Sequence, residues 1–292
     1  MQETTTVGLI GLGLMGSAIA HRLLGAGFSV LGFDIDASKR RSLVERGGVE
    51  ASSVAEIAAS CRIVALAVFT TDQVEQVVEG AGGLLGSATR IAICTSTCDP
   101  DRVEALAARV AARGLALLEV PVSGTSTQVE RGDGVGLVAG AEAAAKEADR
   151  VLAAFCPKRY LLGAPGNGGR AKLAINLILG LNRAAIAEGL AFAERLGLDR
   201  GHFLDVAKGS AAYSQVMDVK GELWASDRFE PPMSRVDQSL KDFLLMLEMG
   251  KRVGMQLPFA ERYVELMGDC VAHEEAALDN AIIINAIRRR AH

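Results

Sequence analysis

The sequence has no excess of basic residues. Its 292 residues include 31 Lys and Arg against 35 Asp and Glu, which gives a formal net charge of −4. Because binding to nucleic acid needs a basic surface, we expect no nucleic-acid partner. Half of the chain is hydrophobic and 23% is charged, a balance that excludes disorder as its general state. At this length two domains are expected rather than one.

Cysteine and histidine are too few and too scattered for a metal centre. The five cysteines form no C-x-x-C pair, and the four histidines have no metal-ligand spacing, so we expect no bound metal. An odd number of scattered cysteines is typical of reduced thiols. We therefore expect a cytoplasmic protein.

Long hydrophobic runs are also missing near the start of the chain. The longest uncharged stretch there, residues 4–20, holds four glycines and is too short to span a bilayer. Gln2 and Glu3 stand before it in place of the positive charges that open a secretory signal. We expect neither a signal nor a membrane partner.

The first half of the chain alternates short β-branched runs with longer amphipathic runs. This pattern is typical of βαβ units and a parallel sheet, and it predicts an α/β Rossmann-type domain over residues 1–164. Strands are expected at 7–12, 29–33, 63–68, 89–94, 116–121 and 134–140. Helices are expected at 14–26, 38–46, 71–78, 100–113 and 141–154.

After residue 166 the sequence favours helices only, which predicts an all-α domain over residues 165–292. Helices are expected at 167–195, 237–252, 258–271 and 279–290. The first would be about 43 Å long and is apolar nearly all round between residues 173 and 193, so it must be buried on every side. One small domain cannot cover it, and we therefore expect a second copy of the chain, in a homodimer or a homotetramer.

A glycine-rich motif follows the first expected strand and opens the first expected helix. It predicts a dinucleotide site, because its glycines allow a tight turn, a close approach to pyrophosphate and close packing of helix on strand. The alternative is a tight turn that holds no ligand. The expected cofactor-binding residues here are Gly11, Leu12, Gly13, Leu14, Met15 and Gly16.

A carboxylate stands where the next expected strand ends. Asp34 lies 18 residues after Gly16, close to the spacing at which an acidic residue binds the adenosine ribose. Its charge would repel a 2′-phosphate, and no Arg follows it directly, so NAD is favoured over NADP. The alternative is a helix cap, which is the role expected of Asp36.

Five segments, in the same order along the chain, resemble the β-hydroxyacid dehydrogenases, the family of 3-hydroxyisobutyrate, tartronate semialdehyde, L-threonate and 6-phosphogluconate dehydrogenases. They are GLGLMG at 11–16, CTSTCDP at 94–100, EVPVSGT at 119–125, GNGGRAKLAIN at 166–176 and LKD at 240–242. The family's patterns for the middle three are D-x-S-T-x-x-P, D-A-P-V-S-G-G and G-x-G-x-x-x-K-x-x-N-N. Here Cys94, Glu119, Thr125 and Ile175 depart from them.

The resemblance implies site residues. Lys172 matches the catalytic lysine and Asn176 its companion, one helical turn apart. Ser123, Gly124 and Thr125 match the turn that grips the substrate carboxylate. The implied cofactor-binding residues outside the glycine motif are Val68, Phe69, Thr70, Ser96, Thr97 and Lys241.

With this resemblance, the residues imply an oxidoreductase that transfers hydride between NAD and a small 3-hydroxy acid, with Lys172 as general acid and base. The alternatives are an imine reductase and a non-catalytic dinucleotide-binding module, and Lys172 argues against both. Lys172 could also be a lysine that extends from a buried helix to water, and Lys241 could be a surface partner of Asp237. The substrate acid is left open by the departures at Cys94, Thr125 and Ile175.

Overall fold

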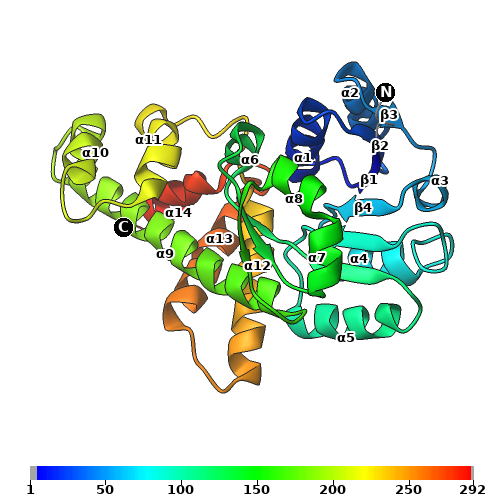
Figure 1. Ribbon diagram of the computed structural model, residues 1–292. Coiled ribbons are helices and arrows are strands. Elements are labelled where there is room, and N and C mark those ends of the chain that lie inside the picture. Colours follow the sequence, from blue (N-terminus) through cyan, green and yellow to red (C-terminus); the bar gives the residue numbers. More distant parts are fainter. Residues whose placement is uncertain (1–4, 291–292) are drawn as a thin grey trace. The chain divides into compact units, whose positions relative to one another are not determined.

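The computed structural model describes residues 5–290. The chain forms two compact units, and the division between them falls at Lys172 and Leu173, inside the long helix α9 (Asn167–Arg195) (Figure 1). Each unit is described by itself.

The first unit is built on a six-stranded parallel sheet of order β3-β2-β1-β4-β5-β6. Its strands are β1 (Thr6–Ile10), β2 (Ser29–Phe33), β3 (Val49–Glu50), β4 (Ile63–Leu66), β5 (Ile91–Cys94) and β6 (Ala116–Glu119). Its connecting helices are α1 (Leu14–Gly25), α2 (Ala37–Glu45), α3 (Val54–Ser60), α4 (Thr71–Glu79) and α5 (Pro100–Ala111). The strand order reverses between β1 and β4, the point at which such sheets bind nucleotides.

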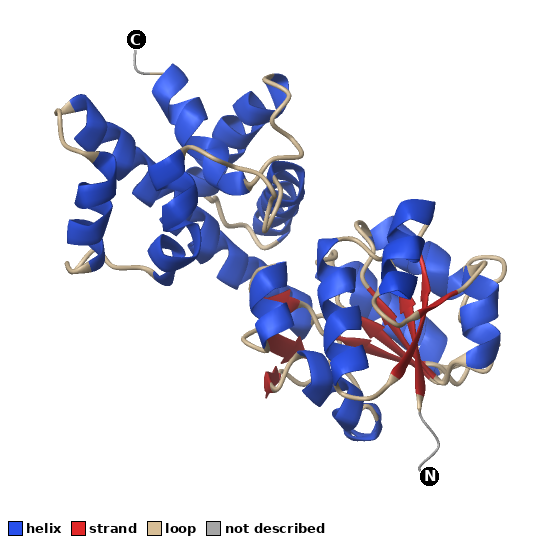
Figure 2. Cartoon of the chain, turned by 90° about the horizontal axis from the view of Figure 1, so that it is seen from above, coloured by secondary structure: helices blue, strands red, loops and turns tan. Residues whose placement is uncertain are grey.

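A smaller sheet of order β7-β8-β9 completes this unit, which holds every strand of the described residues (Figure 2). Its strands are β7 (Val122–Ser123), β8 (Val135–Val138) and β9 (Lys158–Leu161), and the helices beside it are α6 (Ser126–Arg131), α7 (Glu142–Glu147) and α8 (Asp149–Phe155).

Both faces of the large sheet are covered, which explains why its central strands are apolar throughout. In β4, Ile63 and Ala65 pack into one core cluster, and Val64 and Leu66 pack into the other. Alternate side chains of a strand point to opposite faces, so a strand between two helical layers needs apolar residues at every position.

The second unit contains helices only, apart from one isolated bridge between Arg235 and Asp279. It comprises the rest of α9, then α10 (Arg200–Lys208), α11 (Gln215–Ser226), α12 (Val236–Arg252), α13 (Pro258–Ala272), the 3₁₀ turn η1 (Asn280–Ile282) and α14 (Ile283–Arg289). Gly180 lets α9 pack closely, because a Cβ atom there would lie 2.4 Å from the Phe243 ring.

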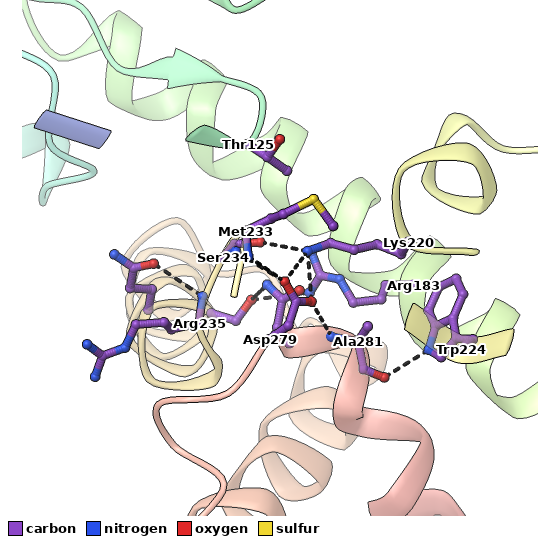
Figure 3. A network of polar contacts seen from close by, with 12 residues as sticks. Thr125, Arg183, Lys220, Trp224, Met233, Ser234, Arg235, Asp279 and Ala281 are labelled. Atoms are coloured by element: carbon purple, nitrogen blue, oxygen red, sulfur yellow. Dashed lines mark hydrogen bonds and ion pairs between the residues drawn. The ribbon is translucent and has the colours of Figure 1, made fainter. Parts of the chain in front are cut away.

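A buried ion pair fixes the turn before α14 (Figure 3). Lys220 of α11 donates to both carboxylate oxygens of Asp279, at 2.8 and 2.7 Å. Asp279 also accepts from the backbone amides of Met233 and Ala281, at 2.8 and 2.9 Å. Since both charges are buried, the pair and its hydrogen bonds hold α11 and η1 in one arrangement.

The expected fold class is confirmed, and α9 has the bounds that the sequence predicts. Several elements differ from expectation. The structure adds the strands β3, β7 and β9 and the helices α3, α6, α10 and α11, and the helix expected at 279–290 is η1 followed by α14. Two further differences have a local cause. The first strand ends at Ile10 because Gly11 takes a φ of +92°, which no strand residue adopts. The helix expected at 141–154 is two helices, because Ala148 has a ψ of 0° and breaks the run.

Helix α9 exposes much of its apolar surface within one chain. Only 22% of its most apolar 18-residue window is buried. By length and composition α9 could cross a membrane, although a core helix of a soluble protein meets the same two criteria. Within one chain this surface is therefore left uncovered, and the second copy that the sequence leads us to expect stays a prediction.

Candidate active site

The turn after β1 requires two of its glycines for the fold and leaves the third open. A Cβ atom on Gly11 would lie 2.5 Å from the carbonyl oxygen of Ala67, and one on Gly16 would lie 1.9 Å from that of Gly11. A Cβ atom on Gly13 would have no atom of the described residues within 4 Å, apart from those of its immediate neighbours along the chain. Gly13 therefore borders open space, as expected where a backbone must approach a ligand closely.

The N-terminus of α1 also fits an anion. Gly13 is its N-cap and provides no side-chain hydrogen bond, and the first turn holds no acidic residue. Leu14 is exposed and Met15 is half-buried. First-turn amides that no side chain caps can donate to a pyrophosphate, so these residues fit a dinucleotide.

Asp34 directly follows β2, and its side chain forms a hydrogen bond with the glycine-rich turn after β1. Its carboxylate accepts from the backbone amides of Leu12, at 2.7 Å, and of Asp36, at 2.9 Å. Two cations of α2 lie near: the Lys39 ammonium is 3.8 Å from Asp34 Oδ1, and Arg40 donates to the Asp34 carbonyl oxygen at 2.6 Å. Asp36 caps α2 by accepting from Ser38, which confirms its expected role.

The loops after β4 and β5 lie together, because the two strands are parallel neighbours. Ser96 donates to the carbonyl oxygen of Val68 at 2.6 Å and so joins the loops. Thr70 caps α4, Phe69 is partly exposed and Thr97 is half-buried. The loop after β5, which carries Ser96 and Thr97, therefore stands three strands from β2, across the point between β1 and β4 where the strand order reverses.

The expected carboxylate turn begins on β7. Ser123 is its last strand residue, Gly124 has a φ of +138°, and Thr125 is the N-cap of α6. The Thr125 hydroxyl accepts from the Gln128 amide at 3.3 Å. Thr125, which stands where the family pattern has Gly, thus uses its hydroxyl to cap α6, the helix that follows the turn.

Lys172 meets this turn. The side chain is buried, with 8% of the residue exposed, and its Nζ donates to the carbonyl oxygen of Val122 at 2.8 Å. Val122 directly precedes Ser123, so the amine lies beside the expected carboxylate turn. A lysine that extended to water would be far more exposed, and that interpretation of Lys172 is wrong.

Asn176 and Lys241 share one partner in the helical unit. Asn176 donates to Asp242 Oδ2 at 2.9 Å, and the Lys241 ammonium is 3.1 Å from Asp242 Oδ1. Asp242 was not among the expected site residues, although it belongs to the LKD segment that indicated Lys241. Its carboxylate fixes the amide of Asn176.

Two acidic groups of the site have raised pKa values. Burial raises the pKa of Glu119 to about 6, against hydrogen bonds from the first amides of α9. The pKa of the Cys94 thiol is raised well above its ordinary value, because Cys94 forms a hydrogen bond with Cys98 and is buried. Cys94 therefore stays protonated at neutral pH. Residues 5–290 contain no group of three or more side chains arranged to hold a metal.

Comparison with known proteins identifies the family. Residues 6–163 match the model of the NAD-binding domain of 6-phosphogluconate dehydrogenase, and residues 166–287 match that of the NAD-binding region of NADP-dependent 3-hydroxyisobutyrate dehydrogenase. The L-threonate dehydrogenase of Cupriavidus necator is 33% identical over 87% of this chain and 86% of its own. The chain belongs to the β-hydroxyacid dehydrogenase family.

Other members of the β-hydroxyacid dehydrogenase family match over nearly the full length. The 2-hydroxy-3-oxopropionate reductase of Escherichia coli is 27% identical over 98% of both chains. The crystal structure of a 3-hydroxyisobutyrate dehydrogenase from Salmonella typhimurium superposes with a TM-score of 0.87, at 27% identity over 96% of this chain and 99% of its own. These matches support an NAD(P)-dependent oxidoreductase of hydroxy acids over the imine reductase and the binding module.

Proposed function

We propose that the protein oxidises a small 3-hydroxy acid with NAD⁺, and reduces the matching semialdehyde or keto acid in the reverse direction, with Lys172 as general base and acid. The observation that carries this proposal is the buried Lys172 amine, 2.8 Å from the Val122 carbonyl oxygen and next to Ser123. A buried amine beside a carboxylate-binding turn suits an acid with a hydroxyl close to its carboxylate.

The mechanism assigns one task to each group. When bound, the dinucleotide supplies the hydride acceptor. The turn of Ser123, Gly124 and Thr125 binds the substrate carboxylate and so orients the carbon that reacts. Lys172 Nζ takes the proton of the substrate hydroxyl, and the carbonyl of Val122 orients that amine. Asn176, its amide fixed by Asp242, donates to the same hydroxyl.

For the cofactor we propose NAD. The support is Asp34, whose buried carboxylate stands at the end of β2, where it would accept from the ribose and repel a 2′-phosphate. NADP is the second candidate, because Lys39 and Arg40 lie beside Asp34 and could bind that phosphate.

The first test is the initial rate of NADH or NADPH formation with a panel of alcohols. The panel contains 3-hydroxyisobutyrate, glycerate, threonate and a carboxylate-free alcohol, each with NAD⁺ and NADP⁺. We expect activity confined to the acids and at least tenfold higher kcat/KM with NAD⁺, about 1.4 kcal/mol of discrimination. Equal rates with the carboxylate-free alcohol would contradict the role of Ser123, and a preference for NADP⁺ would assign Lys39 and Arg40 to the phosphate.

The second test removes the proposed base. Lys172→Ala should lower kcat by about 10²- to 10⁴-fold, the usual contribution of a positioned acid or base, and leave NAD(P)H binding within about twofold. Stopped-flow absorbance measures the first and quenching or enhancement of NAD(P)H fluorescence the second. The matched control is Lys146→Ala, which removes an exposed lysine of α7. Retention of turnover by Lys172→Ala would refute the mechanism.

We further propose a cytoplasmic homo-oligomer that binds a small carboxylate-bearing substrate. The five cysteines are buried free thiols, which suits a reducing compartment. The support for the oligomer is the exposed apolar surface of α9.

A further inference from the structure

The first turn of α9 is wrapped around a buried carboxylate. Glu119, the last residue of β6, has 2% of its surface exposed. Its Oε2 accepts from the Gly166 amide at 2.9 Å, and the amides of Gly168 and Gly169 lie close enough to the carboxylate to lower its pKa. A Cβ atom on Gly169 would lie 2.6 Å from Oε1, and one on Gly168 would lie 2.9 Å from Oε2. Only glycines allow the helix to approach the carboxylate this closely.

The same helix carries Lys172 three residues later. Lys172 returns to the segment that begins with Glu119, because its Nζ donates to Val122, three residues after that glutamate. The start of α9 is therefore attached at two points, by the carboxylate of Glu119 and by the amine of Lys172. The first attachment fixes the helix position from which the second is made.

We propose that Glu119 is a positioning residue, whose carboxylate holds the first turn of α9 so that the Lys172 amine stands at the carboxylate-binding turn. This inference rests on the proposed function of Lys172. A carboxylate suits the place, because the free amides and the positive end of the helix dipole both favour a negative charge there.

Few charged groups bear on Glu119. The Cys94 thiol of β5 is protonated. Arg170 of α9 donates hydrogen bonds to Asp101 and Glu104 of α5, at 2.8 and 2.7 Å. Burial raises the pKa of Glu119 to about 6, while the three glycine amides and then Arg170 oppose the shift. Protonation near pH 6 turns one acceptor oxygen into a donor and weakens the attachment of α9.

The test compares Glu119→Gln with Glu104→Gln, using the best substrate of the panel. Both changes replace a carboxylate near the start of α9, but Glu104 is exposed and accepts from the Arg170 side chain at 2.7 Å, whereas Glu119 accepts from a backbone amide. Glu119→Gln should lower kcat by about tenfold or more, since displacement of a reacting group by about 1 Å can cost 10²-fold, and leave the KM for NAD(P) within about twofold. Glu104→Gln should leave both constants unchanged.

The pH profile adds a readout that a merely structural role would not move. In the unaltered protein kcat should fall as the pH is lowered through an apparent pKa of about 6. This fall should be missing in Glu119→Gln. A step at pH 6 that persists in Glu119→Gln, or an unchanged kcat, would overturn the proposal.

Hydrogen exchange tests the attachment without turnover. Amides of residues 166–172 should exchange about fivefold faster or more in Glu119→Gln than in Glu104→Gln, the effect of losing a helix cap. Equal exchange would overturn the inference even if no substrate were found. If Glu119→Gln fails to fold, Gly169→Ala keeps the carboxylate but displaces it from the helix, and we expect the same fall in kcat and the same faster exchange of amides 166–172. If Lys172→Ala abolishes turnover but Glu119→Gln and Gly169→Ala both keep the kcat of the unaltered protein, the inference fails and the proposed function stands.

Discussion

At the scale of single residues, Glu119 links stability to pH in an uncommon direction. Its pKa is about 6 in the folded protein against an ordinary value of 4.5, so the fold favours the protonated form. Its contribution to the free energy of unfolding is therefore largest below about pH 4.5 and is lost as the pH rises through 6. The shift corresponds to about 2 kcal/mol. Relative to Glu119→Gln, the unaltered protein should gain urea resistance as the pH falls from 7 to 4.5.

The comparison with Glu119→Gln cancels the other carboxylates, which titrate alike in both proteins. A difference in urea midpoint that stays constant across this pH range would contradict the raised pKa. As the pH falls, kcat should decrease while stability increases. Protonation of Glu119 removes a hydrogen-bond acceptor from the start of α9, which lowers kcat, and it also relieves the cost of a buried charge, which raises stability. Stability that rises while kcat falls distinguishes a positioning residue from a residue that only holds the fold together.

At the scale of elements, sequence patterns predicted those helices and turns that depend on residues close together along the chain. The bounds of α9 follow from its composition and from the glycines before it, and the turn at Gly11 follows from a motif of six residues. The two-residue strands β3 and β7 have too few residues for any periodicity. The short helix α6 depends on a capping box between Thr125 and Gln128, in a segment where the sequence indicated only a substrate turn.

The contacts that build the site are less accessible to sequence analysis, because they join distant residues. Glu119 meets Gly166 across 47 residues, and Asn176 meets Asp242 across 66. No spacing rule covers such pairs, so the sequence predicted which segments matter and could not predict that Glu119 would cap α9. The substitution of Glu for the family's Asp was visible, but its consequence depends on packing.

At the scale of the whole molecule, the exposed face of α9 calls for a covering surface. Ile178 and Phe192 have 61% and 64% of their surface exposed, and their spacing of fourteen residues, nearly four turns, puts them on one face. A second copy of the chain would bury this face, so light scattering after gel filtration should give two or four times the chain mass of 30.6 kDa.

The double variant Ile178→Glu and Phe192→Glu should shift this mass to that of a smaller assembly, because charges on a buried apolar interface cost several kcal/mol each. Val44→Glu is the matched control, since Val44 is an exposed apolar residue of α2 in the other unit. Two results would count against the second copy: an unaltered protein that is monomeric at micromolar concentration, or one that sediments with phospholipid vesicles. The latter result would instead assign the apolar face of α9 to a membrane, for which its length and composition suffice.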